Sequence, residues 1–133
     1  MYRKINGMAG LGALALLIAV PATALAYGVI LQGDLIGPSP GAGHGTVFYK
    51  SNERGTHASL RIDVQGLQNV DTALVVIQGH AVATIALDAD GNGSLHLATQ
   101  RGDTVPVLQA GNIVDIYDAS NTRVLLKGFV TYP

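Results

Sequence analysis

ALVVIQGHAVATIALDADGNGSLHL, residues 73–97, is the stretch that decides the predicted fold. It holds three short apolar runs, separated by Gly79-His80 and by the glycine-rich segment Asp90–Gly93. In the last run Leu95 and Leu97 alternate with a polar residue, a pattern typical of a strand with one buried face. Asp, Asn and Gly are the residues that tight turns between strands require. The stretch therefore predicts antiparallel β-structure.

The same pattern continues on both sides of this stretch, and no segment of ten or more residues shows a helical period with caps. Turn-forming residues, such as those of the Pro- and Gly-rich loop 37–43, separate the apolar runs. The predicted fold is all-β: an antiparallel sandwich or small barrel of seven to eight short strands. The predicted strands are 28–35, 45–51, 58–65, 73–78, 81–88, 94–99, 112–117 and 123–131, with hairpins around 52–55, 90–93 and 120–122.

Alternation predicts which side chains are buried. The run 73–77 is apolar at every position, which is typical of a central strand covered on both faces, as when one sheet packs on another. Other strands alternate, so one set of their residues should point into the core. The side chains predicted to point inward are Leu60, Ile62, Val64, Ile85, Leu87, Leu95, Leu97, Ile113 and Ile116.

The first 26 residues are typical of a secretory signal peptide. Arg3 and Lys4 precede an uncharged apolar run, 8–20, and Ala24-Leu25-Ala26 provides a small-x-small cleavage pattern before Tyr27. The predicted organisation is a cleaved signal peptide, 1–26, followed by a single β-domain, 27–133. An uncleaved anchor is the alternative, because residues 8–26 carry no charge and are nearly long enough to span a bilayer. The predicted location is the periplasm or the cell exterior, with no membrane span after cleavage.

Charge and cysteine content exclude several classes of function. Two of the eight basic residues lie in the predicted signal, whereas all nine acidic residues follow it, so the mature domain has a net charge of about −3. This balance argues against binding to nucleic acid or to an anionic membrane, which both favour concentrated Lys and Arg. The chain has no cysteine, so it contains no disulfide, thiol nucleophile or cysteine metal site.

The segment Asp88–Leu95 (DADGNGSL) is the best candidate for a metal site. Asp88, Asp90 and Asn92 match the oxygen ligands at positions 1, 3 and 5 of a calcium loop, and Gly93 is the glycine at position 6. Position 12 is Thr99 instead of the bidentate glutamate, and predicted strands flank the loop where an EF-hand has helices. A plain turn is the favoured interpretation and a weak calcium site is the alternative; no other cofactor is predicted.

Histidines and carboxylates provide no stronger signal. His44, His57, His80 and His96 show no recognised ligand spacing, so surface positions are favoured over a shared metal. Asp115 and Asp118 are paired carboxylates of a kind that acid–base chemistry can use, but no nucleophile motif accompanies them. The sequence therefore predicts no enzyme and no catalytic residue.

The tripeptide Arg101-Gly102-Asp103 matches a cell-adhesion motif. Three residues occur together by chance too often to indicate integrin binding. We interpret the tripeptide as a turn between strands.

Segment 85–128 resembles small exported bacterial all-β proteins of unassigned function. The resemblance rests on IALDADGNGSLHL (85–97), RGDTVPVLQAGNIVDI (101–116) and VLLKG (124–128). It implies an extracytoplasmic β-domain and transfers no catalytic or binding residue.

These observations predict an exported, non-catalytic structural or interaction domain with an unidentified extracytoplasmic partner. A small metal- or ligand-binding module is the alternative, and an enzyme of unknown type is the third. An interaction domain should present an exposed edge strand or an apolar patch. A binding module should bring side-chain oxygens or imidazoles together, and an enzyme should show a concave pocket with paired titratable groups.

Overall fold

The computed structural model describes residues 28–133 except 53 and 55, and the regular secondary structure of this part of the chain is almost entirely β-strand. One short 3₁₀-helix, η1 (Thr99–Arg101), follows the sixth strand. The described strands are β1 (Val29–Ile36), β2 (His44–Ser51), β3 (Ala58–Gln65), β4 (Thr72–Ile77), β5 (His80–Ala86), β6 (Gly93–Ala98), β7 (Ile113–Asp118) and β8 (Val124–Phe129). The predicted all-β fold is confirmed, and each predicted strand agrees with an observed one to within two residues at either end.

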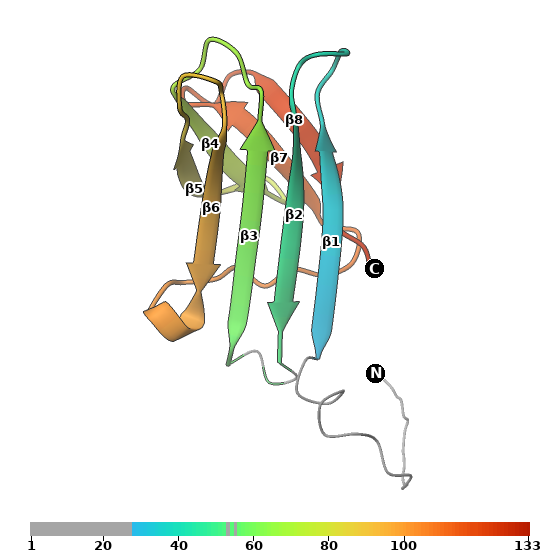
Figure 1. Ribbon diagram of the computed structural model, residues 1–133. Coiled ribbons are helices and arrows are strands. Elements are labelled where there is room, and N and C mark those ends of the chain that lie inside the picture. The colour runs from blue at the N-terminus through green and yellow to red at the C-terminus, as the bar shows by residue number, and fades with distance from the viewer. Residues whose placement is uncertain (1–27, 53, 55) are drawn as a thin grey trace, which may run out of the picture.

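All the strands belong to one antiparallel sheet with the order β5-β4-β7-β8-β1-β2-β3-β6. The sheet curls so that β6, β3, β2 and β1 lie in front of β5, β4, β7 and β8, and it forms a nearly closed barrel (Figure 1). The two edge strands, β5 and β6, come close together at the turn that joins them but form no ladder with each other. A curled single sheet therefore replaces the two packed sheets of the sandwich alternative.

Two of the three predicted hairpins are present, and one is wrong. β2 pairs with β3, and β7 pairs with β8, as predicted. The turn at 88–92 exists, but β5 pairs with β4 whereas β6 pairs with β3. The tight turn thus connects the two edges of the sheet across the seam of the barrel. The short segment Gln78-Gly79, with both residues at positive φ, forms the hairpin turn that pairs β4 with β5.

The barrel interior is filled by side chains from every strand. Of the residues predicted to point inward, Leu60, Ile62, Val64, Ile85 and Ile116 are buried, while Leu87, Leu95 and Leu97 are half-buried against the core. Ile113 was predicted inward but is 42% exposed. Residues 113 and 116 are an odd number of positions apart and a regular strand cannot point both to one face; here Val114 and Ile116 fill the core.

The apolar run 73–77 has a different explanation from the predicted one. Ala73, Val75 and Ile77 point into the barrel, and β4 is an interior strand between β5 and β7. On its outer face Val76 is buried but Leu74 is only half-buried, because no second sheet packs there. The outer face of β4 is therefore partly apolar.

Residues 102–112 carry the chain from β6 across to β7 on the other wall of the barrel (Figure 1). Leu108 is buried in the core and Val105 packs against it, so this connection contributes to the packed interior. Its end is tied to the C-terminal segment by a hydrogen bond from the N–H of Gly111 to the carbonyl of Val130.

The predicted signal peptide, 1–26, lies outside the described residues. Within the part of the chain that is described, no helix has the length and apolar character needed to cross a bilayer.

Candidate functional site

The acidic turn uses its oxygen atoms to hold its own backbone. Asp88 Oδ1 accepts hydrogen bonds from the N–H groups of Asp90, at 2.9 Å, and Asn92, at 3.0 Å. Asn92 Oδ1 accepts one from the N–H of Gly66, at 2.9 Å, in the connection between β3 and β4. All three predicted ligands are exposed. The side-chain oxygens of Asp88 and Asn92 accept hydrogen bonds from backbone amides, which explains the presence of these two residues in a turn. Calcium binding stays a prediction.

Gly91 allows this turn to lie close against the backbone of Leu67. Its φ is +79°, and a Cβ on it would lie 2.0 Å from the carbonyl oxygen of Leu67. The N–H of Leu67 in turn donates to the carbonyl of Gly91 at 3.1 Å. The turn therefore anchors the β3–β4 connection at the seam of the barrel, which is a structural role.

The four histidines are exposed and occupy separate positions: His44 and His80 begin β2 and β5, His57 lies in the β2–β3 turn, and His96 lies within β6. Among the described residues, no three His, Asp or Glu side chains converge in a way that could hold a metal ion. Asp115 and Asp118 also have separate surroundings. Asp118 Oδ1 accepts hydrogen bonds from the N–H groups of Thr122 and Arg123 in the β7–β8 turn, and Lys127 lies beside Asp115.

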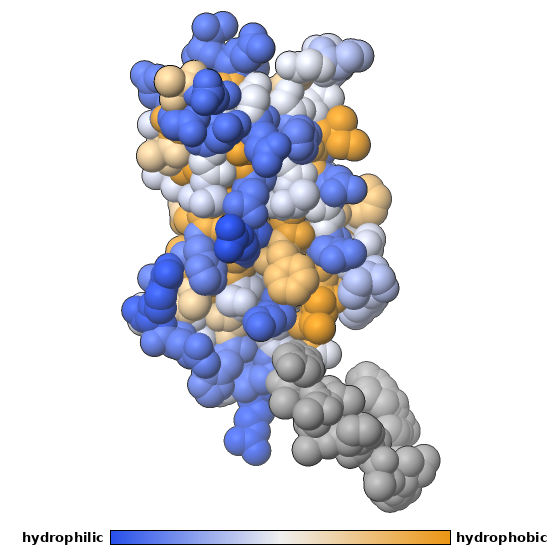
Figure 2. All heavy atoms as spheres, in the orientation of Figure 1, coloured by the Kyte–Doolittle hydropathy of each residue, from blue (hydrophilic) through white to orange (hydrophobic). Residues whose placement is uncertain are grey.

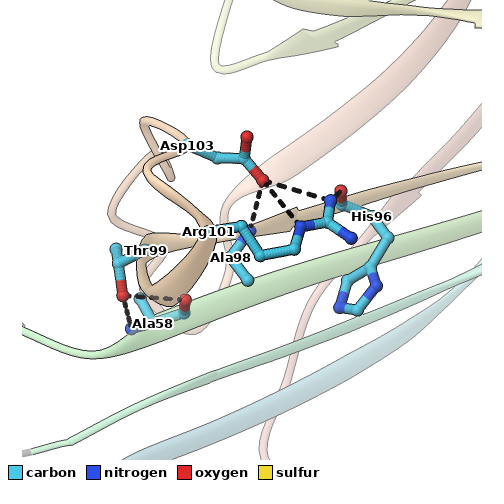
Figure 3. A network of polar contacts seen from close by, with 6 residues as sticks. All are labelled: Ala58, His96, Ala98, Thr99, Arg101 and Asp103. Atoms are coloured by element: carbon cyan, nitrogen blue, oxygen red, sulfur yellow. Dashed lines mark hydrogen bonds and ion pairs between the residues drawn. The ribbon is translucent and has the colours of Figure 1, made fainter.

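The Arg-Gly-Asp tripeptide covers the free edge of β6, as Figure 3 shows. Asp103 Oδ2 accepts a hydrogen bond from the N–H of Ala98 at 3.0 Å and pairs with the guanidinium of Arg101 at 3.1 Å. The same guanidinium donates to the carbonyl of His96. The hydrogen bond from Ala98 and then that from Arg101 lower the pKa of Asp103 below its ordinary value of 3.8. The predicted turn is confirmed, with Gly102 at φ +85°.

These contacts occupy backbone groups that an edge strand otherwise offers to another chain. The opposite edge, β5, has a different interruption. Its register against β4 shifts between Val75 and Val76, which leaves Val82 without a partner on β4. Both sides of the seam are thus poorly suited to accept an added strand.

Exposed apolar side chains gather elsewhere, on the outer face of four adjacent strands. Ile36 of β1 is 68% exposed, Phe129 of β8 is 60% exposed, Ile113 of β7 is 42% exposed and Phe48 of β2 is 41% exposed. The order β7-β8-β1-β2 makes these strands neighbours, and Ile113 pairs directly with Phe129. We call these four residues the apolar strip. Figure 2 shows hydrophobic residues gathering toward β1 and β2, whereas hydrophilic residues dominate over β6.

The strip borders a groove of about 600 Å³. Its position depends on a close approach of β1 and β8. A Cβ on Gly33 would lie 2.2 Å from the carbonyl oxygen of Phe129, and one on Gly128 would lie 2.1 Å from that of Asp34. Asp34 is the only ionisable residue in the lining of this groove. The lining consists of Gln32, Gly33, Asp34, Ile36, Thr46, Val47, Phe48, Phe129 and Thr131.

A partly covered ion pair lies within the same face. One cross-strand row runs Val76, Asp115, Lys127, Ile36 over β4, β7, β8 and β1. Lys127 Nζ lies 3.2 Å from Asp115 Oδ1, although this oxygen is buried and the angles do not make the contact a hydrogen bond. Asp115 is only 8% exposed on the outside of the barrel. The outer side of β7 therefore holds a carboxylate that the sheet has already largely removed from water.

No family model matches the chain, and no curated protein matches it significantly.

The apolar strip is the feature that sequence reasoning missed. Phe48 lies between the inward residues Val47 and Tyr49, and Ile36 follows the inward residue Leu35, so alternation alone already places both outside. This alternation was the signal in the sequence that could have identified the two residues as exposed. It could not show that β8 lies beside β1, and without this pairing the two phenylalanines look unrelated in the sequence.

Proposed function

We propose that this chain is an exported, non-catalytic interaction domain that binds a protein partner through the apolar strip. The observation that carries the proposal is the grouping of four large apolar side chains, each more than two-fifths exposed, on four adjacent strands. Exposed apolar side chains that gather on one part of a surface are typical of protein interaction sites. The export of the domain is supported by the signal-like sequence of residues 1–26.

The chemistry of the groove supports binding over catalysis. A hydrolytic or acid–base site needs a nucleophile or a pair of titratable groups at hydrogen-bond distance. The lining of this groove offers one carboxylate, Asp34, among aromatic, aliphatic, hydroxyl and amide groups. Such a surface can bury apolar side chains of a partner and satisfy a few of its hydrogen bonds at the rim.

Site-specific photocrosslinking tests the proposal. The full chain is expressed in the source organism with p-benzoylphenylalanine in place of Phe129 or, as a matched control, in place of Ser94, which is exposed on β6. We expect irradiation to give a discrete covalent adduct from position 129 and none from position 94. Lack of an adduct at 129, or equal adducts at both positions, would contradict the proposal.

A further inference from the structure

We infer, building on the function proposed above, that the partner of the apolar strip is a second copy of this chain, which docks strip to strip about a two-fold axis. Such an interface is isologous: the same patch on both copies must supply the projecting side chains and the hollows that receive them. The strip meets this requirement in its shape and in its charge.

Projections and hollow lie together on one face. Phe129 and Ile36 are the most exposed residues of the strip, and both border the groove whose lining includes Gly33 and Phe48. A two-fold axis near this groove brings Phe129 of each copy to the groove of the other. The contact buries two aromatic side chains that are otherwise in water, and aromatic residues of this kind carry much of the energy of protein interfaces.

The charges of this face balance, although the chain as a whole is acidic. Its outer surface carries Asp34 on β1, Lys50 on β2, Asp115 on β7 and Lys127 on β8. The rest of the mature domain holds the excess of acidic residues. Two copies that meet through this face therefore repel each other less than two copies that meet through the acidic remainder of the surface.

The register also offers complementary pairs across the axis. Lys127 pairs with Ile36, and Asp34 lies two residues from Ile36 on the same face of β1. Among the described residues Asp34 has no ion-pair partner. In an antiparallel docking, Lys127 of one copy approaches Asp34 of the other while it stays beside Asp115 of its own chain, and the symmetry repeats this contact.

The size of the face sets the expected strength. The groove is lined by residues of β8, β1 and β2 and of the C-terminal segment, and three strands about 4.8 Å apart and up to eight residues long span roughly 14 by 26 Å, or about 370 Å². Specific interfaces bury about 800 Å² of accessible surface per partner, and transient ones bury less. We expect a reversible dimer whose population rises with protein concentration, not a permanent one.

Analytical ultracentrifugation of the protein purified after export tests this inference. Over a hundredfold range of concentration we expect the average mass to rise from one chain toward two. Phe129→Asp should keep the mass at one chain, while Ser94→Asp, which adds the same charge on β6, should behave like the unaltered protein. Because a change beside Gly128 can disturb folding, Ile36→Lys at the strand end provides a second variant, and circular dichroism reports the fold of each.

A single-chain mass at every concentration, or dimers that persist in both folded strip variants, would overturn the inference. The photocrosslinking experiment separates this failure from failure of the proposed function. An adduct at position 129 with twice the mass of the chain supports the second copy. An adduct of another mass preserves the interaction function and overturns the dimer, and lack of any adduct overturns both.

Discussion

Asp103 and Ala98 form a reciprocal pair at the edge of the barrel. The carboxylate of Asp103 accepts the N–H of Ala98 at 3.0 Å, and the N–H of Asp103 donates to the carbonyl of Ala98 at 3.2 Å. An aspartate thus takes the place of the next strand for one residue of β6. This contact explains the Arg-Gly-Asp tripeptide without a receptor, because Arg101 holds the carboxylate and covers the carbonyl of His96 as well.

Removing this edge cover should promote self-association through β6. In Asp103→Ala the N–H of Ala98 loses its acceptor and becomes available to another strand. We expect a lower Tm and light scattering that grows with concentration on mild heating. Asp63→Ala, which removes a surface carboxylate paired with Arg61 on the interior strand β3, is the matched control and should scatter no more than the unaltered protein. Equal scattering by the two variants would refute the edge-cover role.

Acid should destabilise the fold through two carboxylates. Hydrogen bonds from the N–H of Ala98 to Asp103 and from that of Thr122 to Asp118 lower the pKa of each carboxyl below 3.8. A carboxyl whose pKa is lower in the folded state contributes stability above its unfolded pKa, and this stability is lost as pH falls through the folded pKa. We expect Tm to be flat from pH 7 to about 5 and to fall below about 4.

The double variant Asp103→Asn/Asp118→Asn checks this assignment. It should melt lower than the unaltered protein at pH 7, and the difference should shrink as pH falls, because the unaltered carboxyls are then protonated too. A difference that stays constant from pH 7 to pH 2.5 would assign the acid sensitivity to other groups.

Two glycines with the same backbone conformation should respond differently to substitution. Gly91 and Gly102 have φ of +79° and +85°, but a Cβ on Gly91 meets Leu67 backbone at 2.0 Å whereas one on Gly102 meets nothing within 4 Å. Gly102→Ala should therefore lower the free energy of unfolding by about 1–2 kcal/mol, the cost of left-handed backbone. Gly91→Ala adds a collision to this cost and should abolish cooperative unfolding in urea. Similar urea midpoints for the two variants would show that the 88–92 turn does not pack on Leu67.

The strands and most of the core were predictable because their signals are local. Alternation and turn residues placed every described strand to within two residues, and inward residues such as Leu60 and Ile62 are fully buried. The error at Ile113 was also local, since the parity of the strand already excluded it once Ile116 was assigned to the core. Local sequence patterns do not determine which strands lie beside each other in the sheet.

The features that could not be predicted are those that depend on which strands pair with each other. The turn at 88–92 has the composition of a hairpin turn, but the two strands that it joins do not pair with each other. β6 pairs with β3 and β5 pairs with β4, so the turn connects the two edges of the barrel. The candidate site depends on a similar choice. Ile36 and Lys127 are 91 positions apart in the chain and become neighbours only because β8 lies beside β1. No periodicity within either strand contains that information.

The acidic turn provides a final prediction that separates its structural role from calcium binding. Asn92→Ala leaves the N–H of Gly66 without its side-chain acceptor and should cost about 1 kcal/mol whether or not calcium is present. Asp90→Ala removes a carboxylate whose side chain makes no hydrogen bond within the described turn, so Tm should change little. The measurement is thermal melting of each variant in EDTA and in excess calcium. A calcium-dependent rise in Tm that Asp90→Ala abolishes would establish the metal-binding alternative, because only a ligand that binds the folded state raises its stability in this way.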